Sequence, residues 1–115
     1  EVNYIGAGCS PIETDCGWLL IYHGVEETPK GKVYHACAAL FHLDKPELEI
    51  ARLSEPLFSP TKEWEKEGVV NHVVFPTGTA LFGKELYIYY GAADQHIAVV
   101  SLNIDDLLHE LKKQP

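Results

Sequence analysis

Gly17-Trp18-Leu19-Leu20-Ile21-Tyr22-His23-Gly24 is the stretch of sequence that decides the fold. Apolar and aromatic side chains fill almost every position, so an extended segment here is apolar on both faces. The stretch ends at a glycine and is too short for a typical helix. It therefore predicts a central strand that other parts of the protein cover on both sides.

The same pattern returns 67 residues later along the chain. Leu86-Tyr87-Ile88-Tyr89-Tyr90-Gly91 matches the stretch from Leu19 to Gly24 at the Leu, Ile, Tyr and Gly positions. A period of this size is typical of a propeller blade, a four-stranded sheet with long loops, and a β-sandwich does not explain it as readily. The 115 residues hold a little under two such units. Because a propeller closes on itself to protect its strand edges, we expect the missing blades elsewhere in the natural protein or in a partner.

Further strands are predicted on both sides of these two. Residues 33–43 follow a Pro29-Lys30-Gly31 turn and are again apolar on both faces, which makes them the hairpin partner of the first strand. The remaining predicted strands, separated by Gly and Pro turns, are residues 50–53, 73–75, 79–82, 85–90 and 96–102.

The C-terminal tail departs from the strand pattern. Asn103 can cap a helix that carries Leu107, Leu108 and Leu111 on one face. The sequence therefore predicts an all-β class with a short C-terminal helix, and one partial propeller domain over residues 1–115.

Composition and charge exclude several classes of function. The chain is 46% hydrophobic and 23% charged, which is ordinary for one packed domain. Its net charge of -8 repels phosphate backbones and anionic lipids, and no apolar run approaches the roughly 20 residues of a membrane helix. Nucleic-acid and membrane binding are disfavoured. The opening residues, without Met or a signal segment, are those expected inside a domain.

Cysteine and histidine spacings indicate no metal site. Cys9, Cys16 and Cys37 are odd in number and lack a C-x-x-C spacing, so reduced thiols are favoured, while a Cys9–Cys16 bridge stays open. The histidines form no H-E-x-x-H motif, and His35 with His42 is interpreted as a strand-edge pair. Serine-nucleophile, P-loop and dinucleotide motifs are absent from the sequence, so we predict no cofactor.

Two polar residues follow the repeated strands. His23 lies at the end of the first strand and Asp94 just after the second, which suggests a shared rim or pocket. The alternative is that His23 is a hydrogen-bonded core histidine and Asp94 a turn former, and neither residue alone identifies an enzyme.

Four ordered motifs resemble the C-terminal region of glycoside hydrolase family 130, so we expect this chain to be the C-terminal portion of a larger catalytic domain, and together they span nearly the whole chain. They are Ile5-Gly6-Ala7-Gly8 with Pro11-Ile12-Glu13-Thr14, the stretch from Gly17 to Val25, residues 65–78 with Val73-Val74-Phe75-Pro76-Thr77-Gly78, and Leu86 to Asp94.

The resemblance implies a five-bladed propeller with a central pocket that cleaves β-mannosides with inversion, by phosphorolysis or, in some branches, by hydrolysis. In that mechanism a carboxylic acid protonates the leaving sugar oxygen. The acid lies in an early blade and has no counterpart among these residues. We therefore expect no catalytic residue in this chain, no activity from the chain alone, and inorganic phosphate as a co-substrate if the enzyme is a phosphorylase.

The acceptor side of the pocket is what the resemblance carries over to this sequence. His23 matches a phosphate-contacting histidine, Tyr34 a nearby pocket tyrosine, Phe75 a sugar-facing aromatic residue, and Asp94 an aspartate at the rim.

Tyr4 departs from the family pattern, because the phosphorylases usually carry a phosphate-binding lysine at this position. Phosphate needs positive charge to hold it, whereas water needs a general base. The substitution therefore favours hydrolysis. Phosphorolysis stays open because upstream arginines could hold the phosphate, and a non-catalytic carbohydrate-binding propeller is the alternative from another class.

Partners and location follow from the same resemblance. We expect an oligosaccharide substrate, the remaining blades of the same protein and, as an open alternative, a homo-oligomer. A phosphorylase would be cytoplasmic, and a hydrolase periplasmic or secreted.

Overall fold

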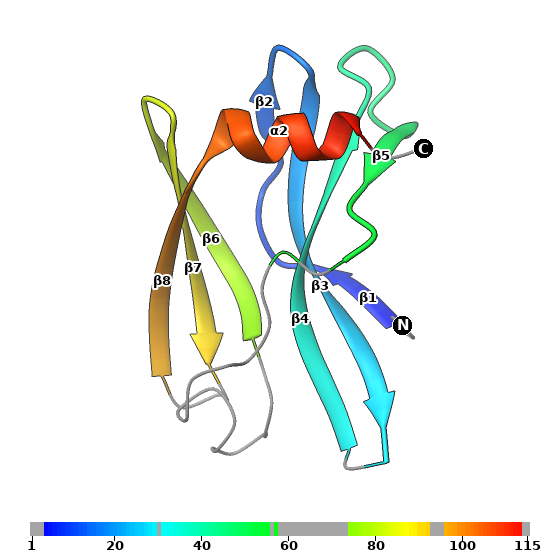
Figure 1. The fold of residues 1–115 in the computed structure, drawn as a ribbon, viewed down its shortest axis with the longest axis vertical. Coiled ribbons are helices and arrows are strands. Elements are labelled where there is room, and N and C mark those ends of the chain that lie inside the picture. The colour runs from blue at the N-terminus through cyan, green and yellow to red at the C-terminus, as the bar shows by residue number, and fades with distance from the viewer. Residues whose placement is uncertain (1–3, 30, 56, 58–73, 93–95, 114–115) are drawn as a thin grey trace.

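Two antiparallel β-sheets packed face to face, with one helix across one end, make up the structure (Figure 1). This computed structural model describes residues 4–29, 31–55, 57, 74–92 and 96–113. The all-β class with a short C-terminal helix is confirmed.

The first sheet is centred on a long hairpin of two strands. Its five strands are β1 (Tyr4–Ala7), β2 (Ile12–Thr14), β3 (Gly17–Thr28), β4 (Gly31–Phe41) and β5 (Glu49–Arg52). They lie in the order β1-β3-β4-β5, and β2 also pairs with β3. The deciding stretch therefore forms the first half of a central strand, as predicted.

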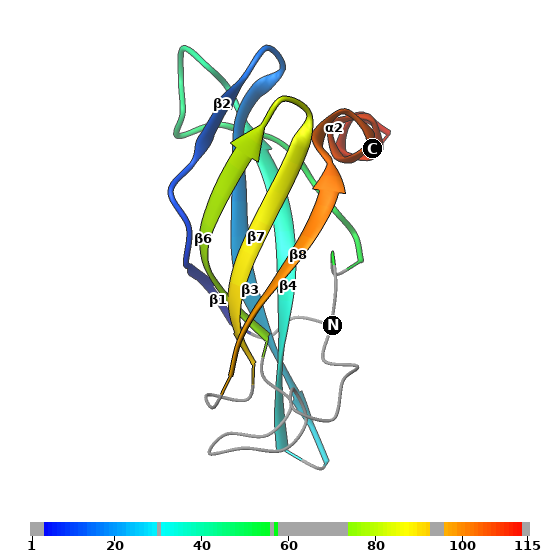
Figure 2. The same ribbon diagram turned by 90° about the vertical axis from the view of Figure 1, so that its left-hand side faces the viewer.

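The second sheet is a three-stranded meander. Its strands are β6 (Val74–Phe82), β7 (Glu85–Ala92) and β8 (His96–Asn103), in the order β6-β7-β8. The repeated stretch from Leu86 to Gly91 forms its middle strand. Figure 2 shows this sheet in front of the first, with the strands of both running close to the long axis.

A threonine turn starts the central strand. The Thr14 hydroxyl accepts hydrogen bonds from the backbone N–H groups of Cys16 (3.2 Å) and Gly17 (3.1 Å), and donates one to the Gly17 carbonyl (2.6 Å). Gly17 has a φ of +144°, and a Cβ atom there would lie 2.3 Å from the Phe41 carbonyl oxygen. Only glycine fits at this turn, because any side chain would collide with backbone.

The hydrophobic core lies between the sheets and brings the two repeated strands together. Leu19 and Ile21 of β3 and Leu86 and Ile88 of β7 are completely buried in one cluster. Burying a side chain of this size stabilises the fold by about 1.5–3 kcal/mol. The positions that match in the sequence repeat are thus the positions that hold the two sheets against each other.

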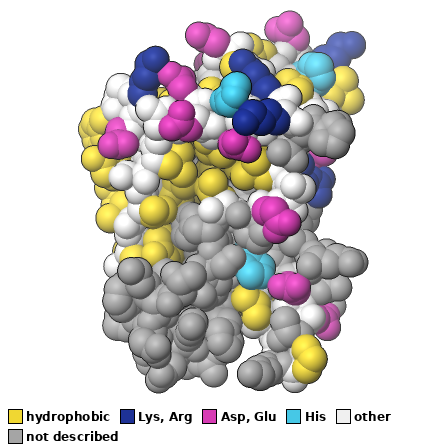
Figure 3. All heavy atoms as spheres, in the orientation of Figure 1, with side chains coloured by type: hydrophobic (Ala, Val, Ile, Leu, Met, Phe, Trp, Pro, Cys, Tyr) yellow, Lys and Arg dark blue, Asp and Glu magenta, His cyan; other side chains and the backbone are white. Residues whose placement is uncertain are grey.

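Helix α2 (Ile104–Lys112) closes one end of this core. Asn103 caps it, with Oδ1 accepting a hydrogen bond from the backbone N–H of Asp106 at 3.1 Å, as predicted. Lys84 forms an ion pair with Asp105 in the first turn at 2.6 Å. The leucines predicted on one face are buried, and charged side chains gather on the opposite, solvent side (Figure 3).

Three sequence predictions need correction. Residues 74–75 and 79–82 belong to a single strand, β6, because a bulge between Pro76 and Gly78 absorbs the break that proline causes, while residue 73 lies outside the described residues. The strands β1 and β2 were not predicted, since both are short, and the partner of β1 on β3 also lies far along the chain. His35 and His42 form no pair: His35 contacts Glu26, and the His42 N–H bonds to the Leu48 carbonyl.

The three cysteines are free thiols, so the Cys9–Cys16 bridge that the sequence left open does not form. Burial raises the pKa of the Cys9 and Cys37 thiols, which keeps them protonated near neutral pH. Within the described part of the chain, no helix is both long and apolar enough to span a bilayer.

Replacing Gly8 with alanine should destabilise the fold, because a Cβ atom there would lie 2.1 Å from the Pro76 carbonyl oxygen, where the two sheets approach each other. Overpacking of this kind costs about 1–3 kcal/mol in the free energy of unfolding. Chemical denaturation of the purified protein measures the loss. Gly78→Ala is the matched control, since no neighbouring atom lies within 4 Å of its Cβ position. Equal stability of the two variants would contradict the prediction.

Candidate functional site

The site residues that the sequence indicated lie on the strands away from α2. His23 and Tyr34 face the same side of the β3–β4 hairpin. Tyr4, on β1, pairs with Val25 of β3. Phe75, near the start of β6, pairs with Gly91 of β7. Asp94 lies outside the described residues. The structure therefore brings His23 and Tyr34 into contact, and for Tyr4 and Phe75 it gives the backbone position.

The His23 and Tyr34 rings lie diagonally across the hairpin, with centroids 5.9 Å apart and planes tilted by 38°. Both strand neighbours of His23 are small: Gly6 on β1 and Ala36 on β4. The missing bulk leaves room for the imidazole ring beside the tyrosine. Residues of small size at these two positions thus determine where the histidine can lie.

Burial lowers the pKa of His23 below its ordinary value. The ring is therefore neutral near pH 7, with one nitrogen able to donate a hydrogen bond and the other able to accept one. Such a ring can take up a proton when an anion such as phosphate arrives, because a nearby negative charge raises the pKa again.

Sequence reasoning missed Tyr90, the position that matches His23 in the repeat. Tyr90 is buried in the second sheet and packs against Ala36, the residue paired with His23 on β4. The repeat itself carried the signal, because it aligns Tyr90 with His23. The comparison made from the sequence was instead between His23 and Asp94, four residues further along.

A second pair that sequence reasoning missed lies on the opposite face of the hairpin. The Glu26 and His35 side chains lie 3.1 Å apart between Oε1 and Nε2, with side chains 35% and 12% exposed. The hairpin turn near Gly31 fixes the register that brings them together, so the signal was present in the sequence.

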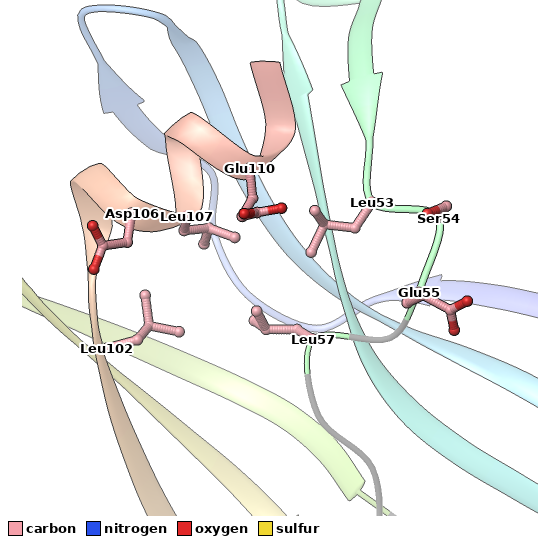
Figure 4. A pocket seen from close by; sticks show the side chains of 8 residues that line it. All are labelled: Leu53, Ser54, Glu55, Leu57, Leu102, Asp106, Leu107 and Glu110. Carbon is pink, nitrogen blue, oxygen red and sulfur yellow. The ribbon is translucent and has the colours of Figure 1, made fainter. Parts of the chain in front are cut away.

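Two hollows lie in the described part of the chain away from His23 and Tyr34. One of about 360 Å³ lies beneath α2, with an apolar floor and carboxylates at its edge (Figure 4); it is lined by Leu53, Ser54, Glu55, Leu57, Leu102, Asp106, Leu107 and Glu110. The other is an apolar hollow on the outer face of the first sheet, lined by Pro11, Trp18, Leu20, Phe41 and Pro46. Neither contains a residue of the predicted acceptor side.

Among the residues that the structure describes, no three His, Cys, Asp or Glu side chains are close enough to hold a metal ion. What the surface at His23 and Tyr34 can do is contact a ligand through an imidazole and a phenol.

Comparison with known proteins shows to which family the chain belongs. Residues 2–113 match the family described as beta-1,4-mannooligosaccharide phosphorylase, so the chain belongs to glycoside hydrolase family 130. The resemblance seen in the sequence is confirmed.

Individual relatives share this assignment. A 1,2-beta-oligomannan phosphorylase from a Thermoanaerobacter species is 42% identical over 93% of this chain and 35% of the relative. A beta-1,2-mannobiose phosphorylase from Listeria innocua, solved with beta-1,2-mannobiose, is 38% identical over 94% of this chain and 30% of its own, with a TM-score of 0.86. A second solved structure, from work on family members that hydrolyse beta-1,2 mannosidic linkages in Candida mannan, is 32% identical over 88% of this chain and 30% of its own, with a TM-score of 0.77. The chain thus spans about a third of the length of these relatives.

The His23 ring should titrate below the ordinary histidine pKa of about 6.5, because burial disfavours its charged form. Tyr34→Ala removes part of the cover and should raise the His23 pKa toward that value. Protonation of His23 also affects the stability of the fold. Because the His23 pKa is lower in the folded state than in the unfolded chain, the unfolded chain binds the extra proton, and folding stability falls as the pH drops below about 6.5. Carbon-13 NMR titration of labelled histidine measures the pKa, and an unchanged His23 pKa in the variant would contradict the role of the tyrosine.

Proposed function

We propose that the protein containing this chain is an inverting β-mannoside phosphorylase, and that this chain supplies the acceptor side of its pocket. The observation that carries the proposal is the family match over residues 2–113, with two mannoside phosphorylases 42% and 38% identical to the chain. The preference for hydrolysis drawn from Tyr4 gains no support from these relatives.

We further propose a five-bladed propeller in which the two sheets are neighbouring blades. Support comes from the outer faces of the sheets, which are apolar although nothing in the described chain covers them. Tyr89, Ile97 and Val99 on the outer face of the second sheet are 42%, 87% and 50% exposed. The outer face of the first sheet is also apolar, since it carries a hollow lined by Trp18, Leu20 and Phe41. Sheets within a closed ring are expected to be apolar on both faces, because each packs between two others.

The proposed reaction divides between this chain and the rest of the protein. A phosphate oxygen forms a bond to the anomeric carbon as the β-glycosidic bond breaks on the opposite face, and a carboxylic acid elsewhere in the protein protonates the leaving oxygen. The products are α-mannose 1-phosphate and the shortened sugar. Within this scheme His23 donates a hydrogen bond to the phosphate, and Tyr34 lies beside it. Phe75 is proposed to face the sugar and Asp94 to lie at the rim.

Hydrolysis is the second candidate, because Tyr4 stands where a phosphate-binding lysine is expected and a structural relative comes from work on hydrolases of this family. The two candidates differ in the nucleophile alone. Without a lysine here, a phosphorylase must hold its phosphate with the His23 imidazole and with cations from other parts of the protein.

The full-length protein should convert β-1,2- or β-1,4-mannobiose to α-mannose 1-phosphate only when phosphate is present. His23→Ala should lower kcat/KM for phosphate by about 10- to 100-fold, the effect of losing a hydrogen bond to a charged group. Chromatography of the products and initial rates measure both quantities.

His109→Ala, which removes a histidine from the exposed face of α2, is the matched control and should leave the rates unchanged. Release of free mannose at the same rate with and without phosphate would establish hydrolysis instead. Tyr4→Lys should then introduce phosphate dependence, since it restores the missing cation.

A further inference from the structure

The two sheets follow the same plan, except that the described part of the second has no counterpart of β5. In each sheet a central strand, β3 or β7, pairs with a strand that precedes it and with a strand that follows it. β3 and β7 run away from the α2 end, and β4 and β8 return toward it (Figure 1). In the first sheet β5 then pairs with β4, whereas in the described part of the chain no strand pairs with β8 on the side away from β7.

Backbone hydrogen-bonding groups of β8 point toward this open side. The Ile104 N–H bonds to the Lys84 carbonyl at 2.9 Å, which continues the register between β7 and β8. Hydrogen-bonded and non-hydrogen-bonded pairs alternate along two antiparallel strands, so the even-numbered residues of β8 are the ones that bond to β7. The N–H and C=O groups of Ile97, Val99 and Ser101 therefore point away from β7, toward the position of a further strand.

The residues of β8 are unlike those of an edge strand that faces water. Native edge strands are short or carry charged residues or proline, which prevents pairing with other chains. β5, at the edge of the first sheet, has four residues and includes Glu49 and Arg52, which form an ion pair at 2.8 Å. β8 has eight residues, and its stretch from Ile97 to Leu102 contains neither a charged residue nor proline. Such an edge is expected to be covered in the intact protein.

A hollow beside β8 indicates what a covering segment contains. The hollow of about 360 Å³ beneath α2 is lined by Leu102 of β8 and by Leu57, which follows β5 in the chain (Figure 4). Glu55, Asp106 and Glu110 place carboxylates at its edge. A strand added to β8 turns alternate side chains toward its two faces, so an apolar side chain fits the hollow and a neighbouring lysine or arginine fits the carboxylates. The net charge of -8 also favours a cationic partner.

The rest of the protein is the source of such a segment that the comparisons favour. The chain spans 30% and 35% of the length of two relatives in its family, so most of such a protein lies outside it.

We propose that an extended segment from this remainder pairs antiparallel with β8 as the fourth strand of the second sheet, in the place that β5 has in the first. It carries apolar side chains on both faces and a lysine or arginine at its end nearest α2. The strand covers the backbone groups of the open side and the apolar stretch of β8 together. Its description as part of a blade rests on the proposed propeller, whereas the pairing itself does not, nor does it depend on the reaction.

Amide hydrogen exchange of the full-length protein, followed by NMR, tests the pairing. The N–H groups of Val99 and Ser101 should exchange within about 10-fold of the rates at Ala98 and Val100, which bond to β7 and serve as the internal reference. Exchange at Val99 and Ser101 that is faster than this overturns the proposal, because it is the behaviour of an open edge.

A proline variant tests the same contact. Val99→Pro removes an N–H that points away from β7, which proline in an edge strand allows, so the bonds to β7 remain. In the full-length protein it should speed exchange at Ser101 by about 10-fold or more, because the added strand is released, and leave Val100 protected. Val99→Thr, which keeps the N–H and the branched side chain, is the matched control. Unchanged exchange at Ser101 in the proline variant overturns the proposal.

Nuclear Overhauser effects identify the segment. The amide protons of Val99 and Ser101 should lie close to backbone protons of a segment outside residues 1–115, within the same molecule. Contacts to residues 58–73, or contacts between labelled and unlabelled molecules in a mixed sample, overturn the proposal, because the strand would then come from this chain or from a second copy. A segment with a carboxylate in place of the lysine or arginine overturns the chemistry assigned to it.

These measurements do not use the reaction, so the two proposals can fail separately. A protein without phosphate-dependent activity overturns the proposed function and leaves the exchange pattern to decide the fourth strand. Fast exchange at Val99 and Ser101 in an active phosphorylase overturns the fourth strand alone.

Discussion

The packing of the two sheets against each other is the constraint on which the rest of the structure depends. Leu19 and Ile21 of β3 and Leu86 and Ile88 of β7 belong to one buried cluster, and each of these side chains is fully removed from water. Because side chains alternate along a strand, this contact also fixes which residues point away from the core. His23 follows Ile21 on the same face of β3, just beyond the packed centre, where two small neighbours leave space. The candidate site is thus an extension of the core face.

The proposed acceptor side of the pocket combines a neutral histidine with a tyrosine in a chain of strongly acidic composition. A net charge of -8 and a tyrosine at position 4 make this part of the protein a weak holder of phosphate by itself. A histidine whose pKa is lowered by burial remains neutral until an anion approaches, and then gains from protonation. This behaviour suits the phosphate site of the proposed phosphorylase, which would have to hold phosphate without the lysine.

The β3–β4 hairpin carries a different contact on each face. The His23 and Tyr34 rings contact each other on one face, and the Glu26 and His35 side chains contact each other on the other. Partly exposed pairs such as Glu26 and His35 contribute little to stability, so the packed core between the sheets contributes far more to the stability of the fold.

The sequence by itself determined the strands, the helix cap and the family. Apolar residues on both faces of Gly17 to Gly24, and their repetition at Leu86 to Gly91, are local patterns. Such patterns can be recognised without knowing which residues they contact in the fold. The same is true of Asn103, whose cap depends on the residues that follow it directly. The tertiary structure decided which residues meet: the short strand β1, the bulge that joins residues 74–75 and 79–82 into β6, the packing of Tyr90 on Ala36, and the contact of His35 with Glu26 and not with His42. These features depend on strand register and on contacts between distant residues, which no single stretch of sequence encodes.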